Sequence, residues 1–156
     1  MAPDRETYID LTPKKYSSRV IHNLRGAAIF ALILTAAMYL SNPSTLSLII
    51  GLLVFLFYLF EEIRWCRIYI TSVSVSPGNK VKFAYLDKDV QHEYSTNLVD
   101  LDIKKAFIWY KVKPKPVPFL VIRNRTDDFV IKQYDVSDWD EEKFNLLINR
   151  FGKLKE

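Results

Sequence analysis

The chain is poor in the side chains on which most enzyme chemistry depends. Its 156 residues include a single cysteine, Cys66, and two histidines, His22 and His92. One thiol excludes an intramolecular disulfide and any zinc site built from several cysteines. The four glycines form neither a phosphate-binding loop nor a nucleophile elbow. We therefore expect no catalytic residue, no metal, no cofactor and no small-molecule substrate for this chain.

The chain also contains a long stretch without any charged residue. Residues 26–60 contain no Asp, Glu, Lys, Arg or His, a stretch long enough for two membrane passages. The turn signal SNPS at 41–44 divides it into apolar helices at about 24–40 and 45–60. Each would be about 25 Å long at about 1.5 Å per residue. We expect a transmembrane hairpin over residues 24–65, with a re-entrant or interfacial hairpin as the alternative.

The distribution of basic residues predicts the orientation of this hairpin. Basic side chains precede the first apolar helix and follow the second, whereas the turn between the helices is uncharged. The positive-inside rule then places both chain termini in the cytoplasm. The basic residues in question are Lys14, Lys15, Arg19, Arg25, Arg64 and Arg67. Residues 1–23 are expected to be a cytoplasmic N-terminal segment of an integral membrane protein.

Residues 66–156 have the pattern of a small cytoplasmic β domain. Apolar and polar residues alternate in short runs that are separated by turn residues such as PGN at 77–79. The predicted strands cover 68–75, 81–86, 90–94, 98–103, 106–112, 118–124 and 129–134.

The chain then changes to helical spacing. Phe144, Leu147, Ile148 and Phe151 fall on one face of a helix predicted over 138–151. Asp138 is the expected N-cap, with Glu141 three residues later in a capping-box arrangement, and Gly152 the expected stop. Such a helix would close one face of the β structure.

The run YSTNLVDLDI at 94–103 and the closing VSDWDEEKFNLLINRF resemble bacterial membrane proteins that carry a pleckstrin-homology-like domain after a two-helix transmembrane hairpin. The resemblance implies an α+β membrane protein: an N-terminal transmembrane hairpin, then a pleckstrin-homology-like antiparallel β-barrel or sandwich with a C-terminal amphipathic helix. It also implies a bacterial inner membrane or its equivalent. Such domains bind lipids, peptides or proteins, so the fold by itself does not select a function.

The most distinctive local feature is a basic ribbon, FIWYKVKPKPVPFLVI, at 107–122. Lysines alternate there with valine and proline, and aromatic residues precede them. Prolines and lysines of this kind protect an edge strand from pairing, which is one interpretation. Contact with a partner protein or with anionic lipid are the other two. The candidate contact residues are Trp109, Tyr110, Lys111, Lys113 and Lys115, together with Arg64 and Arg67.

Three functions remain open at this point. The first is a non-enzymatic, membrane-anchored binding or scaffold module, an accessory subunit that contacts other membrane-protein subunits or a second copy of itself. The second is a sensor of anionic lipid headgroups, and the third is an enzyme or pore subunit that is active only within an assembly. With a net charge of +4 and acids interspersed among the lysines, we expect no nucleic-acid partner.

Overall fold

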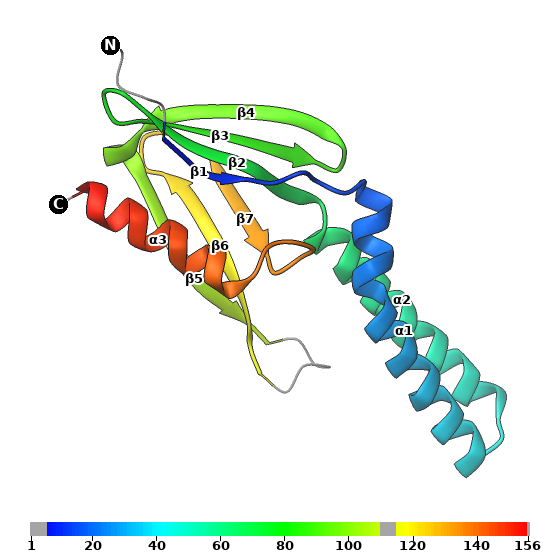
Figure 1. Ribbon diagram of the computed structural model, residues 1–156. Helices are drawn as coiled ribbons and strands as arrows, with labels where there is room; N and C mark the ends of the chain where they lie inside the picture. The colour runs from blue at the N-terminus through cyan, green and yellow to red at the C-terminus, as the bar shows by residue number, and fades with distance from the viewer. Residues whose placement is uncertain (1–5, 110–114, 156) are drawn as a thin grey trace.

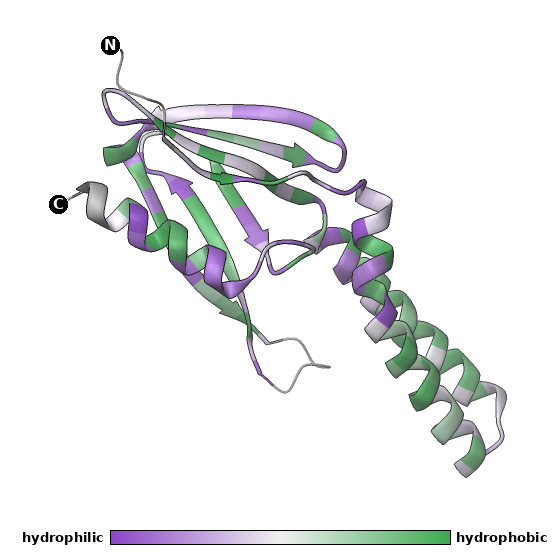
Figure 2. Ribbon diagram, in the orientation of Figure 1, coloured by the Kyte–Doolittle hydropathy of each residue, from purple (hydrophilic) through white to green (hydrophobic). Residues whose placement is uncertain are grey.

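The computed structural model describes residues 6–109 and 115–155 and contains a helical hairpin attached to a β domain (Figure 1). Helices α1 (Tyr16–Ser41) and α2 (Thr45–Trp65) form the hairpin. Both helices are long and apolar enough to cross a membrane. They extend beyond the predicted ranges 24–40 and 45–60, mainly at the ends next to the β domain. Hydropathy changes along the hairpin, which is apolar away from the β domain and polar where it joins it (Figure 2).

Helix α2 approaches α1 closely at Gly51. A Cβ atom placed on Gly51 would lie 1.9 Å from the Oγ1 atom of Thr35. That hydroxyl donates a hydrogen bond to the Ala31 carbonyl at 2.7 Å, which fixes its position in α1. Small side chains on α1, including the buried Ala27 and Ala31, make the same approach possible.

Replacing Gly51 by alanine should therefore force the two helices apart. We expect the free energy of unfolding to fall by about 1–3 kcal/mol, the usual cost of overpacking. Gly26→Ala is the matched control, because a Cβ at that position would have no atom within 4 Å beyond its own chain neighbours and the adjacent backbone of α1. The control should be neutral or stabilising by up to about 1 kcal/mol. Denaturation of both full-length variants in detergent micelles measures the difference, and equal effects would contradict the close packing.

The hairpin is inserted within a sheet rather than placed before the β domain. Strand β1 (Glu6–Asp10) pairs antiparallel with β2 (Ile68–Ser76), which follows α2 directly. Residues 6–23, part of the expected N-terminal segment 1–23, thus contribute strand β1 and the first turns of α1. Because the chain enters the hairpin from β1 and leaves it into β2, two covalent connections join the hairpin to the β domain.

Two antiparallel sheets form the β domain. The first has the order β1-β2-β3-β4, with β3 at Lys80–Asp87 and β4 at Val90–Asn97. The second has the order β5-β6-β7, at Leu101–Ile108, Val117–Asn124 and Val130–Tyr134.

Two strands are predicted at 98–103 and 106–112, but one strand covers their described part; residues 110–112 lie outside the described residues. A 3₁₀ turn, η1 (Leu98–Asp100), precedes the continuous strand β5. No break occurs at the lysine pair, because Lys104 and Lys105 stay in register with Val121 and Leu120 of β6.

Helix α3 (Glu141–Lys155) lies across the open side between the sheets, as its apolar spacing predicts (Figure 1). The predicted start at 138 and the cap by Asp138 are wrong. Asp140 accepts the backbone N–H of Lys143 at 2.9 Å and so caps the helix, whereas Asp138 accepts the phenol O–H of Tyr69. The predicted stop at Gly152 is also wrong, because the helix continues through it to Lys155.

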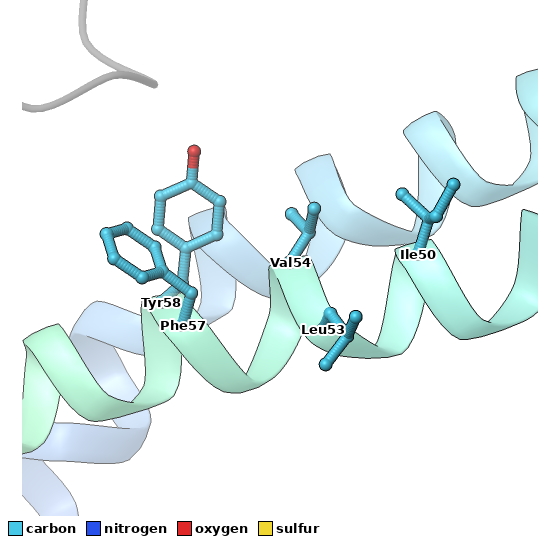
Figure 3. Close-up of a pocket in the computed structure, with 5 residues that line it drawn as sticks. All are labelled: Ile50, Leu53, Val54, Phe57 and Tyr58. Carbon is cyan, nitrogen blue, oxygen red and sulfur yellow. The ribbon is translucent and has the colours of Figure 1, made fainter.

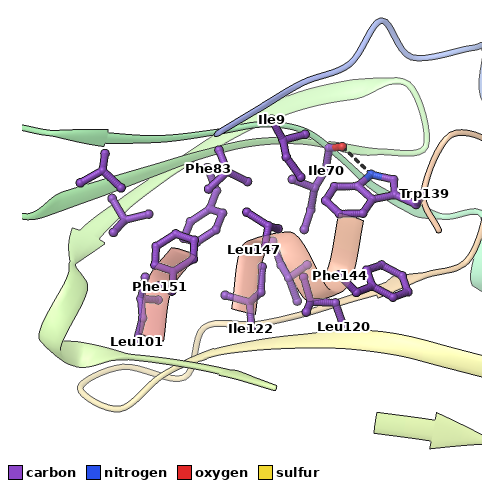
Figure 4. Close-up of a cluster of buried hydrophobic side chains, with 14 of the residues drawn as sticks. Ile9, Ile70, Phe83, Leu101, Leu120, Ile122, Trp139, Phe144, Leu147 and Phe151 are labelled. Carbon is purple, nitrogen blue, oxygen red and sulfur yellow. Dashed lines mark hydrogen bonds between the residues drawn. The ribbon is translucent and has the colours of Figure 1, made fainter. Parts of the chain in front are cut away.

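The main core lies between α3 and the two sheets (Figure 4). Phe144, Leu147 and Phe151 point from α3 toward the inner residues of the strands, including Phe83 and Leu120. All five side chains are at most 3% exposed. The two sheets and α3 therefore share one hydrophobic core.

Candidate functional site at the junction of the hairpin and the β domain

A second apolar cluster joins the hairpin to the β domain. We call it the junction cluster, and its buried members are Val20, Ala27, Tyr58, Trp65, Cys66, Val117, Tyr134 and Val136. The indole of Trp65 stacks on the ring of Tyr134, with centroids 5.1 Å apart and planes 4° apart. Both helices, β6 and β7 therefore meet in one packed contact, and this contact restricts the angle between hairpin and domain.

Polar contacts hold the start of α1 against the turn between β3 and β4. Arg19 is only 1% exposed, and its Nη2 donates to the Lys88 carbonyl at 2.6 Å. Its guanidinium also lies 4.8 Å from the centre of the Tyr69 ring. The backbone N–H of Tyr16 donates to Oδ1 of Asp89 at 2.7 Å. A buried cation with aromatic and carbonyl partners thus fastens α1 to the domain.

Cys66 lies inside this junction and is inert. Its side chain is fully buried, and Asn23 Nδ2 donates to its Sγ at 3.7 Å. Burial, reinforced by the nearby carboxylate of Glu62, raises the pKa of the Cys66 thiol to about 12. At neutral pH the thiol is therefore neutral and inaccessible, which excludes a nucleophilic role for it.

The described parts of the basic ribbon, residues 107–109 and 115–122, include the ends of β5 and β6 at the edge of the domain nearer the hairpin (Figure 1). Ile108 pairs with Val117; Val117 is a buried member of the junction cluster, and Ile108 packs against that cluster. Alternation along β5 turns Phe107 and Trp109 outward, where they are 56% and 74% exposed. Pairing between β6 and β7 begins at Phe119. Before that residue, Val117 and Pro118 of β6 pair only with β5, so β5 and β6 form a two-stranded ribbon there.

The predicted contact residues have different surroundings. Trp109 and Lys115 are exposed at the two sides of the ribbon. Tyr110, Lys111 and Lys113 lie outside the described residues. Arg64 is exposed in the last turn of α2.

Arg67, also a predicted contact residue, is held by the β domain. Its Nε and Nη2 bind the two carboxylate oxygens of Asp87 at 2.7 and 2.8 Å. This bidentate contact lowers the pKa of Asp87. Arg67 therefore connects the end of α2 to the end of β3, and its charge is already compensated.

Two hollows on the hairpin were not expected from the sequence. An apolar hollow of about 330 Å³ lies on α2, lined by Ile50, Leu53, Val54, Phe57 and Tyr58 (Figure 3). A basic hollow of about 490 Å³ lies at the start of α1, lined by Lys14, Lys15, Ser17, Ser18, Ile21, His22 and Arg25. The lysines of the basic hollow were visible in the sequence, but only as an orientation signal. Their convergence depends on where α1 begins.

A polar network on the β domain has a structural role. Asn124 is 2% exposed and donates to the phenol oxygen of Tyr94 and to the hydroxyl of Thr96. Tyr94 in turn donates to Asp127 at 2.6 Å. These bonds join β4 to the turn after β6, so the network connects the two sheets.

No group of three His, Cys, Asp or Glu side chains that could hold a metal is present among the residues described. Comparison of the chain with models of protein families, with curated proteins and with solved structures finds no match. The geometry of the junction, the ribbon and the two hollows is therefore the basis for a functional proposal.

Proposed function

We propose that the hairpin spans a membrane, with both termini and the β domain on the cytoplasmic side. The charge-free stretch 26–60 and the uncharged turn support this placement. The arrangement of the helices agrees with it, since both enter the β domain at the same end of the hairpin (Figure 1). A bacterial inner membrane, or its equivalent, is the proposed location.

Labelling of introduced cysteines tests this topology. Native Cys66 is buried and should stay unlabelled, so the unmodified chain is the background. We expect Ser44→Cys, in the turn, to react with an impermeant maleimide added outside intact cells. Lys104→Cys, exposed on β5, should react only after the cells are opened. The opposite pattern, or reaction of both from outside, would contradict the topology.

Within that membrane, we propose that the chain is a non-enzymatic binding or scaffold module that docks another membrane-protein subunit or a second copy of itself. The observation that carries this proposal is the exposure of Phe107 and Trp109 on a ribbon whose base belongs to the junction cluster. Exposed aromatic side chains on a fixed support are typical of protein contacts, because little conformational entropy is lost when they bind. The junction cluster supplies the fixed support.

Site-specific photocrosslinking tests the docking proposal. A photoreactive phenylalanine derivative is placed at position 109 or, as a matched control, at position 99, since Val99 is 72% exposed on η1 away from the ribbon. After irradiation of intact membranes, position 109 should give a crosslinked species that contains a second polypeptide, and position 99 should give none. A chain that remains monomeric and uncrosslinked at both positions would refute the proposal. Two differently tagged copies distinguish self-association from a different partner.

For the β domain we propose a pleckstrin-homology-like fold. A four-stranded sheet, a three-stranded sheet and a closing C-terminal helix support this assignment. The hairpin would then be an insertion after the first strand. In the alternative function, the ribbon and its neighbouring basic residues would sense anionic lipid. The ion pair between Arg67 and Asp87 weakens this alternative, because it compensates one of the charges that would contact the lipid. A different group of basic residues is better placed for lipid.

A further inference from the structure

We infer that the basic hollow at the start of α1 holds the headgroup phosphate of an anionic phospholipid from the cytoplasmic leaflet. This inference rests on the proposed membrane topology and adds a specific ligand to it. Four lines of observation carry it: the convergence of the basic side chains, their lack of carboxylate partners, their level relative to the apolar stretch, and the exposed apolar face below them.

The hollow is built from side chains of two segments. Lys14 and Lys15 come from the loop that connects β1 to α1, whereas His22 and Arg25 lie on α1 itself. Positions 18, 22 and 25 share one face of the helix, so the Ser18 hydroxyl points to the same side as both of these residues. A volume of about 490 Å³ is within the usual range of ligand pockets. Ammonium, guanidinium and hydroxyl donors are the groups that bind phosphate oxygens.

The charges in the hollow are not compensated within the described part of the chain. Lys14, Lys15 and Arg25 are exposed, and none of them forms a salt bridge with a described carboxylate. The first turn of α1 contains no acidic residue. By contrast, Arg19, about a quarter turn around α1 from this face, is 1% exposed and donates to the Lys88 carbonyl of the β domain. An anion in the hollow would therefore meet unpaired positive charge.

The position of the hollow along α1 favours a lipid over a soluble anion. Arg25 directly precedes the charge-free stretch 26–60, so the hollow lies at the level of the headgroups in the proposed topology. Toward the apolar stretch, α1 presents Ile29 and Leu32, which are 61% and 71% exposed, while Ile21, 59% exposed, lines the hollow itself. Ile29 and Leu32 lie about one turn and about two turns beyond Arg25 on the same side of the helix. A phospholipid whose phosphate occupies the hollow could thus lay its acyl chains along the exposed apolar side of α1.

The test measures lipid retained by the full-length chain. The protein is reconstituted into vesicles of phosphatidylcholine with or without phosphatidylglycerol, then extracted in mild detergent, and its bound lipid is counted by native mass spectrometry. We expect the unmodified chain to retain phosphatidylglycerol in preference to phosphatidylcholine. The triple variant Lys14→Ala, Lys15→Ala, Arg25→Ala should bind it roughly a hundredfold more weakly, because each basic residue near an anionic surface contributes about fivefold.

The matched control removes equal charge elsewhere. The variant Arg123→Ala, Arg125→Ala, Lys132→Ala loses three exposed basic side chains of the β domain, away from α1. It should retain phosphatidylglycerol as the unmodified chain does. Equal loss in both triple variants would show a general charge effect and overturn the specific site. Unchanged circular dichroism and melting temperature would verify that both variants fold, as expected for exposed positions.

Two further outcomes separate the inference from the topology on which it rests. If the chain fails to co-float with phosphatidylcholine vesicles, the proposed membrane anchor itself is refuted. If it co-floats but shows no preference for phosphatidylglycerol, only the lipid site is refuted. Saturable binding of inorganic phosphate to the chain in phosphatidylcholine vesicles, abolished in the Lys14, Lys15 and Arg25 variant, would assign the hollow to a soluble anion instead.

Discussion

Replacing Trp139 by alanine is expected to lower the free energy of unfolding of the chain by about 3–5 kcal/mol. The indole is fully buried in the main core, next to Phe144, whose ring centroid lies 5.6 Å away. Its Nε1 donates to the Ile70 carbonyl at 2.8 Å, so the residue connects the segment before α3 to strand β2 (Figure 4). Removing it leaves a large cavity and a buried carbonyl without its donor.

Two variants separate the contributions at this position. Trp139→Phe keeps most of the apolar volume but loses the hydrogen bond to Ile70, so we expect a smaller loss of about 1–3 kcal/mol. Trp109→Ala is the matched control, because that indole is 74% exposed, and its removal should change stability by no more than about 0.5 kcal/mol. Denaturant unfolding of the full chain in micelles, followed by circular dichroism, gives all three values. An effect at position 109 equal to that at 139 would contradict the assigned core.

Replacing Ile9 by aspartate should detach β1 and lower the free energy of unfolding by about 3–5 kcal/mol. Ile9 is 7% exposed and packs in the main core with residues of β2. A carboxylate at that position would lose the apolar contacts and would be buried without a partner. The backbone N–H of Leu11, which donates to the Thr71 carbonyl at 2.8 Å, would also lose its fixed position.

Hydrogen exchange measures the detachment of β1 directly. In Ile9→Asp we expect faster exchange at the amides that pair β1 with β2, whereas the amides of β6 and β7 should be less affected. Thr7→Asp is the matched control, since Thr7 is an exposed residue of the same strand, and it should cost less than about 1 kcal/mol. Similar and small effects at both positions would show that β1 is not part of the cooperative unit.

The variants of Trp109 and Trp139 also distinguish an effect on stability from an effect on the proposed function. Trp109 is peripheral to the core, so Trp109→Ala should reduce co-purification of the partner while leaving the fold intact. Trp139 supports the fold and lies away from the ribbon, so any loss of function in its variants should follow loss of structure. The two tryptophans thus test the proposed docking surface and the core independently.

The expected strands and helices were mostly found, because local periodicity reports local burial. The spacing of Phe144, Leu147 and Phe151 predicted α3, and all three side chains are buried in the core. Its boundaries were less predictable. Asp138 and Asp140 are both plausible caps in sequence, and the choice between them depends on Tyr69, which takes Asp138 as its acceptor.

Strand β1 could not be predicted from its own residues. It spans only five residues, ETYID, and has one buried apolar side chain, so its intrinsic preference for a strand is weak. Its partner β2 lies on the other side of the whole hairpin in sequence. The pairing becomes favourable only because the hairpin returns the chain to the point at which it left the domain.

At the candidate site too, the sequence identifies the charged residues but not their contacts. Charge alone identified Arg67 as a lipid or partner contact, but the fold places Asp87 within 2.7 Å of it. In the sequence, Lys14 and Lys15 indicate only the orientation of the hairpin, whereas in the structure they line a hollow with Arg25. Sequence states which charges exist, whereas tertiary structure decides which of them are compensated.

By itself the amino-acid order determined that this protein has a helical hairpin around the charge-free stretch 26–60, an alternating β segment and an amphipathic closing helix. Those features follow from the hydropathy of neighbouring residues. Tertiary structure alone decided that the hairpin is inserted between β1 and β2, that Arg19 is buried at the junction, and that the basic side chains of α1 converge. The physical reason is that each of these depends on contacts between segments far apart in the chain, which no local pattern records.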